Sequence, residues 1–213
     1  MKTENLIDML AAESPAVDRA MPARRFTLAL LAGIIAAVLL MAVGLGVRPD
    51  LATVVHGGLF WAKVAFALAM LATALLVTLR LSRPGLPMGG SWAALATPVV
   101  LVWGVAAFVL AQAPAGTRLA LELGHTWKVC PPLIAVLSIP ACIAMFWAVR
   151  SMAPVRLRLA GAATGLVGGA TATLAYCLHC PEMAPPFWAI WYLAGMLIPA
   201  AVGAVIGPRV LRW

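Results

Sequence analysis

The stretch FTLALLAGIIAAVLLMAVGLGV, residues 26–47, decides the fold class of this chain. It contains no charged residue and is long enough to cross a lipid bilayer as one helix, since a span needs about 20 apolar residues. Five further apolar blocks of similar length follow it: Gly57–Thr78, Trp92–Ala111, Val129–Val149, Leu159–Leu178 and Phe187–Ile206. These blocks predict an all-α membrane protein, built as a bundle of six transmembrane helices.

The composition indicates the same class. Hydrophobic residues make up 64% of the 213 positions and charged residues only 10%, whereas a soluble domain has about 45–50% and about 25%. The formal charge of +8 would suggest nucleic-acid binding in a soluble protein. Here the basic residues flank apolar blocks, so we expect the lipid bilayer as a partner and no direct contact with nucleic acid.

The distribution of the fifteen Lys and Arg residues predicts the orientation. Eleven fall at one set of block ends, while Arg48, Arg118 and Lys128 fall at the other and Lys63 lies inside the second block. Because cytoplasmic loops are enriched in Lys and Arg, both termini are predicted to be cytoplasmic. The segment Cys180–Pro186 then lies on the outer face.

Residues 1–24 are the only sizeable polar tract, and we predict a cytoplasmic docking segment there, followed by a membrane domain over residues 25–213. The pattern indicates a short amphipathic helix that ends at Pro15. Helices that lie on membranes usually carry Lys and Arg on the polar face, whereas this one is acidic and is interpreted as a contact for a protein. The candidate contact residues are Glu4, Leu6, Ile7, Asp8, Met9, Leu10 and Glu13.

Two of the four cysteines are predicted to meet at the outer face. Cys130 opens the fourth block and Cys180 closes the fifth, so both lie at the same membrane surface. Cys177 is about one helical turn below Cys180, so it either exchanges with the outer pair or simply packs beneath it. Cys142 is about 18 Å deeper than Cys130 along a helix, which is too far for a disulfide between them. We expect Cys142 to pack as a small hydrophobic residue.

Three kinds of chemistry are open to the outer thiols. A disulfide would join the fourth and fifth spans and add about 2–4 kcal/mol of stability. A redox sensor would use His179 to favour the thiolate of a neighbouring cysteine, with Cys177 as a further reactive thiol. A transient divalent metal, such as zinc, cadmium or copper, is the one cofactor that the residue types suggest. Its candidate ligands are Cys130, His125, His179, Cys180 and Glu182.

Two features concern the interior of the predicted bundle. Lys63 lies about six residues inside the second block, and we expect its side chain to reach the outer headgroups or to pair with Glu122 or Glu182. Glycines recur at four-residue spacing over Gly161–Gly169 and predict a close approach of a neighbouring helix of the same chain.

Seven segments together resemble one known family. They are MKTENLIDMLA, GVRPDL, LFWAKVAFALA, WKVCPPLIAVLSIPA, MAPVRLRLAGAATGLVGG, LAYCLHCPEMAPPFWAIWY and GPRVLRW. With them the chain resembles, over essentially its full length, the NrsF family of bacterial inner-membrane anti-sigma factors, which are six-span negative regulators of extracytoplasmic-function sigma factors. The resemblance implies that Met1–Ala20 holds such a sigma factor inactive at the inner membrane. It also implies that Cys130 and Cys180, at the family's paired cysteine positions, belong to the sensing region, whereas Cys142 and Cys177 look like additions of this sequence.

The predicted function is therefore that of a membrane anti-sigma factor, which releases its sigma factor when the outer cysteine pair senses metal or oxidative stress. The alternative is a membrane thiol-disulfide oxidoreductase coupled to a quinone, with Cys177 and Cys180 as the active pair and Cys130 as the resolving thiol. Such an enzyme needs two outer cysteine pairs, and the sequence offers three outer thiols. Because it also contains no phosphate-binding loop, hydrolase elbow or zinc-protease motif, we predict that the protein is not an enzyme. The identities of the sigma factor and stressor, and the oligomeric state, do not follow from the sequence.

Overall fold

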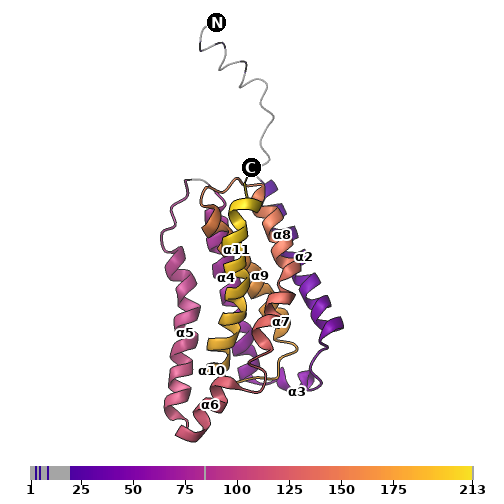
Figure 1. Ribbon diagram of the computed structural model, residues 1–213, viewed down its shortest axis with the longest axis vertical. Helices are drawn as coiled ribbons and strands as arrows, with labels where there is room; N and C mark the ends of the chain where they lie inside the picture. The colour runs from indigo at the N-terminus through magenta and orange to yellow at the C-terminus, as the bar shows by residue number, and fades with distance from the viewer. Residues whose placement is uncertain (1–2, 4, 6–8, 10–19, 84, 213) are drawn as a thin grey trace.

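The computed structural model describes residues 3, 5, 9, 20–83 and 85–212. Over these residues the secondary structure is helical and contains no strand, which confirms the predicted all-α class. Figure 1 shows the long helices side by side along one axis, with α2 beginning and α11 ending at the same end of the molecule. The short helices α3, α6 and α10 lie at the opposite end.

The long helices follow the predicted apolar blocks closely. They are α2 (Met21–Gly44), α4 (Gly58–Leu81), α5 (Ser91–Gln112), α7 (Cys130–Leu137), α8 (Ile139–Arg150), α9 (Leu157–Tyr176) and α11 (Leu193–Val210). Between them lie α3 (Leu51–Val54), α6 (Ala115–Leu123), α10 (Pro185–Phe187) and the π-helical turn η1 (Trp188–Tyr192). Because α2 already begins at Met21, the last four residues of the predicted docking segment, residues 21–24, belong to the first turn of the bundle.

The fourth predicted block is broken rather than straight. Helices α7 and α8 meet at Ser138 with a bend of 45°. Pro140 stands in the first turn of α8, where its missing N–H costs no helical hydrogen bond. The Ser138 hydroxyl donates to the Ala135 carbonyl at 2.6 Å and occupies one of the carbonyl groups at the break.

Among the described residues, the structure has fewer candidate membrane spans than the six that the sequence predicts. Within the described residues, four helical segments are long and apolar enough to cross a membrane, and the bent α7–α8 pair would make a fifth. The predicted block Leu159–Leu178 does form a helix, α9, but α9 is not among them. Its sequence is rich in Gly, Ala and Thr, which lowers its hydropathy below that of a lipid-facing helix.

The position of α9 explains this composition. Fifteen of its twenty residues are buried, and it packs against α11, α4, α8 and α2. A Cβ atom at Gly161 would overlap the backbone of Gly203, and one at Gly165 would overlap the backbone of Pro199. The close helix approach predicted from the glycine spacing is thus confirmed, and the partner is α11 of the same chain.

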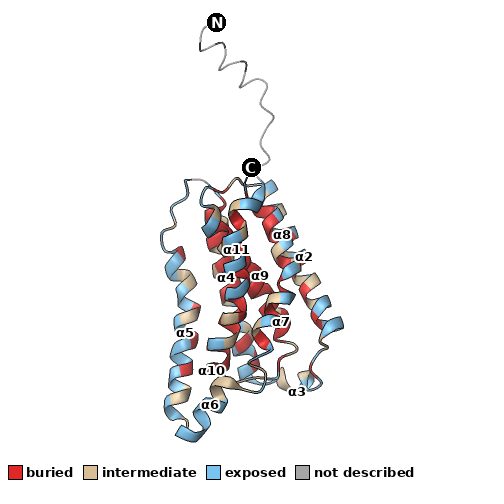
Figure 2. Cartoon of the chain, in the orientation of Figure 1, coloured by how far each residue is buried: buried red, intermediate tan, exposed pale blue. Residues whose placement is uncertain are grey.

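The outer faces of the surrounding helices are apolar. Figure 2 shows α9 largely buried at the centre and α5 mostly exposed at the side. On α5, Val100 and Phe108 are each 66% exposed, and Trp103 is 58% exposed. In the described part of the molecule, the central helix α9 is built mainly of small residues and many large apolar side chains lie on the outside, where a water-soluble bundle would be polar.

Candidate functional site

The chain turns sharply where α9 ends, and this turn is the most heavily bonded polar feature of the described structure. We call residues Cys177–Glu182 the α9 turn. The backbone N–H groups of His179 and Cys180 both donate to the Tyr176 carbonyl, at 3.0 and 2.9 Å. The last carbonyl groups of a helix have no partner within the helix, so they need donors from elsewhere.

The loop between α2 and α3 supplies the first of these donors. The Arg48 backbone N–H donates to the Leu178 carbonyl at 3.1 Å, and Arg48 Nη1 donates to the Cys180 carbonyl at 3.1 Å. His179 Nδ1 lies 2.9 Å from the Gly46 carbonyl oxygen, which can only accept, so Nδ1 carries the hydrogen. The predicted metal ligand His179 is therefore engaged in holding the turn to this loop.

Asp50 holds the Arg48 side chain in place. Its two carboxylate oxygens accept from Arg48 Nε and Nη2, both at 2.7 Å, in the forked geometry that suits a guanidinium. This hydrogen bond lowers the pKa of the Asp50 carboxyl, so the carboxylate stays ionised at neutral pH. Among the described residues this is the one Lys/Arg–carboxylate ion pair.

Lys63 of α4 supplies the second cation. Its side chain is 0% exposed, and Nζ donates to the carbonyl oxygens of Cys180 at 3.0 Å and Glu182 at 3.3 Å. The expectation that Lys63 reaches the outer headgroups, or pairs with the carboxylate of Glu122 or Glu182, is wrong. Its ammonium instead sits at the negative end of the α9 dipole, where backbone carbonyl groups replace its lost hydration.

One carbonyl therefore receives two cations. Arg48 and Lys63 come from different elements and both bond the Cys180 oxygen, and we call this arrangement the cation clasp. Hydrogen bonds to charged groups are worth about 1.5–3 kcal/mol each, roughly twice a neutral one. The clasp fixes the end of the central helix to α4 and to the α2–α3 loop.

Glu182 ties the same turn to a third element, the loop between α6 and α7. Its Oε1 accepts from the His125 backbone N–H at 2.7 Å and faces the Thr126 hydroxyl at 3.5 Å. Trp188 Nε1 donates to the Glu182 carbonyl at 3.4 Å. Gly124 has a φ of +53° where the chain passes the Glu182 carboxylate, and a Cβ there would lie 2.7 Å from it. Glu182 thus has a structural partner in place of a metal ion.

Three thiols lie buried together around the turn. Cys130, Cys177 and Cys180 are each 0% exposed, and all are free thiols. The Tyr176 hydroxyl neighbours Cys130 and Cys180, while Tyr192 neighbours Cys177 and Cys180. The Tyr192 hydroxyl is buried without a hydrogen-bond partner in the described structure. We call these three cysteines and two tyrosines the thiol cluster.

The cluster bears on two predictions, the outer cysteine pair and the set of metal ligands. Cys130 and Cys180, which the block ends place at one surface, both lie within electrostatic reach of each other and of Tyr176. Cys177 is also part of the cluster, although it was expected to be secondary to the pair. The five-residue metal set does not assemble: in the described part of the chain, no group of three or more His, Cys, Asp or Glu side chains is arranged to hold an ion.

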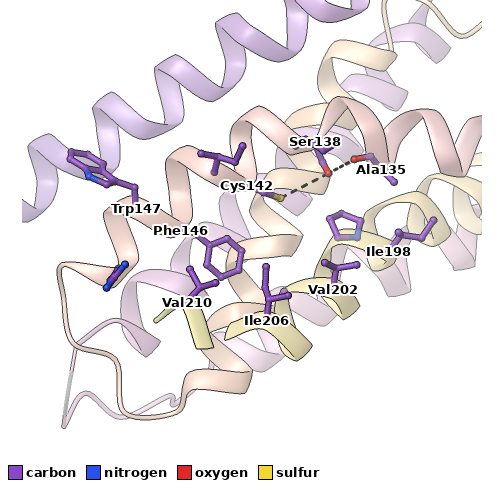
Figure 3. A pocket seen from close by; sticks show the side chains of 14 residues that line it. Ala135, Ser138, Cys142, Phe146, Trp147, Ile198, Val202, Ile206 and Val210 are labelled. Atoms are coloured by element: carbon purple, nitrogen blue, oxygen red, sulfur yellow. Dashed lines mark hydrogen bonds between the residues drawn. The ribbon is translucent and has the colours of Figure 1, made fainter. Parts of the chain in front are cut away.

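Cys142 is separate from the cluster. It is half-buried and lies with Ser138 in a groove of about 550 Å³ between α7–α8 and α11 (Figure 3). Its Sγ faces Gly168 of α9, where a Cβ atom would overlap the sulfur. The groove walls are otherwise almost wholly apolar, with Phe146, Val202 and Ile206 among them. Cys142 therefore packs mainly against hydrophobic surface.

Most of the predicted partner-binding residues lie outside the described part of the chain: Glu4, Leu6, Ile7, Asp8, Leu10 and Glu13. Met9 is described, as helical and exposed. Sequence reasoning missed Arg48 as a site residue. The sequence does distinguish Arg48, because it is one of three basic residues predicted on the outer face, where Lys and Arg are rare.

The fold and the site define an all-helical bundle of the described residues, with an apolar exterior and an internal polar clasp. The sequence model of the family described as "Negative regulator of sigma F" matches residues 10–213. The chain belongs to the NrsF family.

Two relatives cover the whole chain and are covered by it over their whole length. A protein of Azospira oryzae named probable anti-sigma-F factor NrsF is 49% identical over 213 residues. The anti-sigma-F factor NrsF of Caulobacter vibrioides is 37% identical over 215 residues. Both names describe regulators and not enzymes, in agreement with the prediction. No solved structure matches the chain.

Proposed function

We propose that this protein is a membrane-embedded anti-sigma factor, which holds an extracytoplasmic-function sigma factor inactive at the inner membrane. The observation that carries the proposal is the similarity to two proteins named anti-sigma-F factors over their full length, from the first residues to the last. A shared function is expected where both the docking segment and the bundle are retained together.

The exterior of the bundle supports a membrane location. Its large exposed side chains are apolar, as the lipid-facing positions of a span must be. Nine arginines gather at the end where α2 begins and α11 ends, which we assign to the cytoplasm: Arg24, Arg25, Arg80, Arg83, Arg150, Arg156, Arg158, Arg209 and Arg212. The clasp and the thiol cluster then lie at the outer end.

The partner contact is assigned to residues 1–20, which precede the first helix of the bundle. Their sequence combines an apolar ridge with acidic residues, and such a segment complements a basic, helix-binding surface of a DNA-binding protein. A sigma factor held in this way is kept from core polymerase and from promoter DNA. The protein itself then needs no contact with nucleic acid.

The thiol cluster is assigned as the sensor. The Cys180 carbonyl belongs to the cation clasp and the Cys180 thiol belongs to the cluster, so a thiophilic metal ion or an oxidant acting on the thiol would move the end of α9. Because α9 packs directly on α11 and α4, which both reach the cytoplasmic end, a movement of the end of α9 would be passed to that end through these contacts.

The docking assignment predicts the effect of charges placed on the ridge. In the full-length protein, Leu6→Asp with Leu10→Asp is expected to reduce co-purification of the sigma factor at least about tenfold, because a buried interface anchor is replaced by a carboxylate. The matched control is Ser14→Asp with Ala16→Asp, which adds the same charge off the ridge and should retain binding. Equal binding by both variants and the unchanged protein would place the contact elsewhere.

The sensor assignment predicts a difference among the cysteines. Cys130→Ser and Cys180→Ser, each confirmed to insert in the membrane, should abolish induction of a sigma-dependent reporter by cadmium or peroxide. Cys142→Ser is the matched control, because Cys142 lies in the groove apart from the cluster, and it should leave induction intact. Normal induction in both cluster variants contradicts the sensor assignment but leaves the anti-sigma function standing.

A further inference from the structure

We propose that a hollow between the start of α9 and the end of α11 binds an anionic phospholipid. The hollow measures about 740 Å³ and lies at the end of the molecule where the arginines gather. It is lined by Leu157, Arg158, Ala204, Val205, Pro208, Arg209 and Arg212. The inference rests on the membrane location argued above.

Three arginines make the hollow an anion site. Arg158, Arg209 and Arg212 are all exposed, and none of their side chains has a hydrogen bond or an ion pair with another described residue. The acidic residues of the described chain, Asp50, Glu122 and Glu182, belong to the other end. Three free guanidinium groups around one hollow are therefore available to a phosphate.

The start of α9 adds to this positive charge. The helix is twenty residues long and begins at Leu157, in the wall of the hollow. Its first turn contains no acidic residue, and its N-cap, Arg156, makes no side-chain cap. The first N–H groups and the positive end of the dipole are thus unopposed, which favours an anion at this position.

The apolar part of the wall favours a lipid over a free anion. Val205 of α11 is 66% exposed beside Arg209, and Leu197 on the same face is 58% exposed. With Ala201 between them, these residues form a stripe at four-residue spacing that ends at Arg209. The stripe is about 18 Å long from Leu197 to Arg209, comparable to a phospholipid acyl chain. Basic pockets between membrane helices are the expected sites for anionic headgroups.

The test uses the full-length protein purified in a neutral detergent. Its affinity for phosphatidylglycerol, phosphatidylcholine and inorganic phosphate is measured by native mass spectrometry and by thermal shift. We expect phosphatidylglycerol to bind and to raise Tm, and the other two to do neither. The triple variant R158Q/R209Q/R212Q should bind phosphatidylglycerol more than about tenfold more weakly, since each arginine near an anionic surface contributes to attraction.

The control is R24Q/R25Q/R83Q, which removes three arginines at the same end away from the hollow, and it should bind like the unchanged protein. The single variant Arg209→Gln, with a smaller loss, serves if the triple variant does not fold. Equal loss in both triple variants would indicate diffuse attraction and overturn the site. Equal binding of inorganic phosphate would overturn the lipid assignment.

Two further outcomes separate this inference from the proposed function. If the protein fractionates away from membranes, the proposed location fails. A membrane-bound protein without headgroup preference overturns the lipid site alone.

Discussion

Replacing Gly165 by alanine is expected to lower the free energy of unfolding by about 3 kcal/mol, at the upper end of the cost of overpacking. The added Cβ would overlap the carbonyl of Pro199 and lie 2.9 Å from the Cα of Ala200. Both are backbone atoms of α11, so no side chain can rotate away and the two helices must separate. Unfolding by SDS titration, followed by circular dichroism, measures the change.

The matched control is Gly104→Ala in α5, where an added Cβ would have no neighbour within 4 Å. Alanine stabilises a helix by up to about 1 kcal/mol relative to glycine, so this variant should be as stable as the unchanged protein or slightly more so. Similar losses at both positions would mean that the α9–α11 contact is not the tightest packing in the bundle. Because α9 also ends at the thiol cluster, we expect Gly165→Ala to release the sigma factor without a stimulus.

Replacing Lys63 by alanine is expected to cost about 3 kcal/mol, within the range for emptying a buried site. Lys63 is among the largest fully buried side chains, and its loss leaves a cavity beside the carbonyl groups of Cys180 and Glu182. Arg48 still donates to the Cys180 carbonyl, but no other cation takes the place of Lys63. The same SDS titration measures the loss.

The variant Lys63→Met measures the contribution of the charge to stability separately from that of the side-chain volume. Methionine fills most of the space but donates no hydrogen bond, so the two charge-assisted bonds are lost. The cost of burying an ammonium is removed at the same time and offsets this loss, and we expect a net change of only about 1 kcal/mol. If the methionine variant is as unstable as the alanine variant, the cation itself holds the turn, and burying the ammonium costs too little to offset the lost hydrogen bonds.

The placement of helices followed well from local sequence, but their number across the membrane did not. Hydropathy recognises a helix by its lipid-facing side chains, which works for α2, α4 and α5. It understates α9, because a helix surrounded by others is selected for small residues that admit close neighbours. The small residues that let α9 lie at the centre of the bundle also lower its hydropathy, so α9 is not counted among the apolar spans.

The sequence indicated part of the candidate site, its outer cysteines, but it indicated neither Arg48 as a site residue nor the hydrogen bonds that hold the site together. The places of Cys130 and Cys180 at the ends of adjacent blocks indicated that they would meet, and in the structure both are buried within electrostatic reach of each other. For Lys63 the expected partner was a headgroup or a carboxylate, because those are the usual partners of a cation near a membrane surface. The actual partners are backbone carbonyl groups, which every residue carries and which no sequence pattern distinguishes.

The sequence by itself determined that the chain is helical and apolar, where its helices lie, and which end is rich in arginine, because these properties depend on residues close together in the chain. Only the tertiary structure decided that Arg48 and Lys63 share the Cys180 carbonyl, since they stand 132 and 117 positions from it. It also decided that Cys177 joins the thiol cluster and that Arg158 of α9, Arg209 of α11 and Arg212 just beyond α11 surround one hollow. Such arrangements depend on how helices pack, and packing is a property of the whole chain.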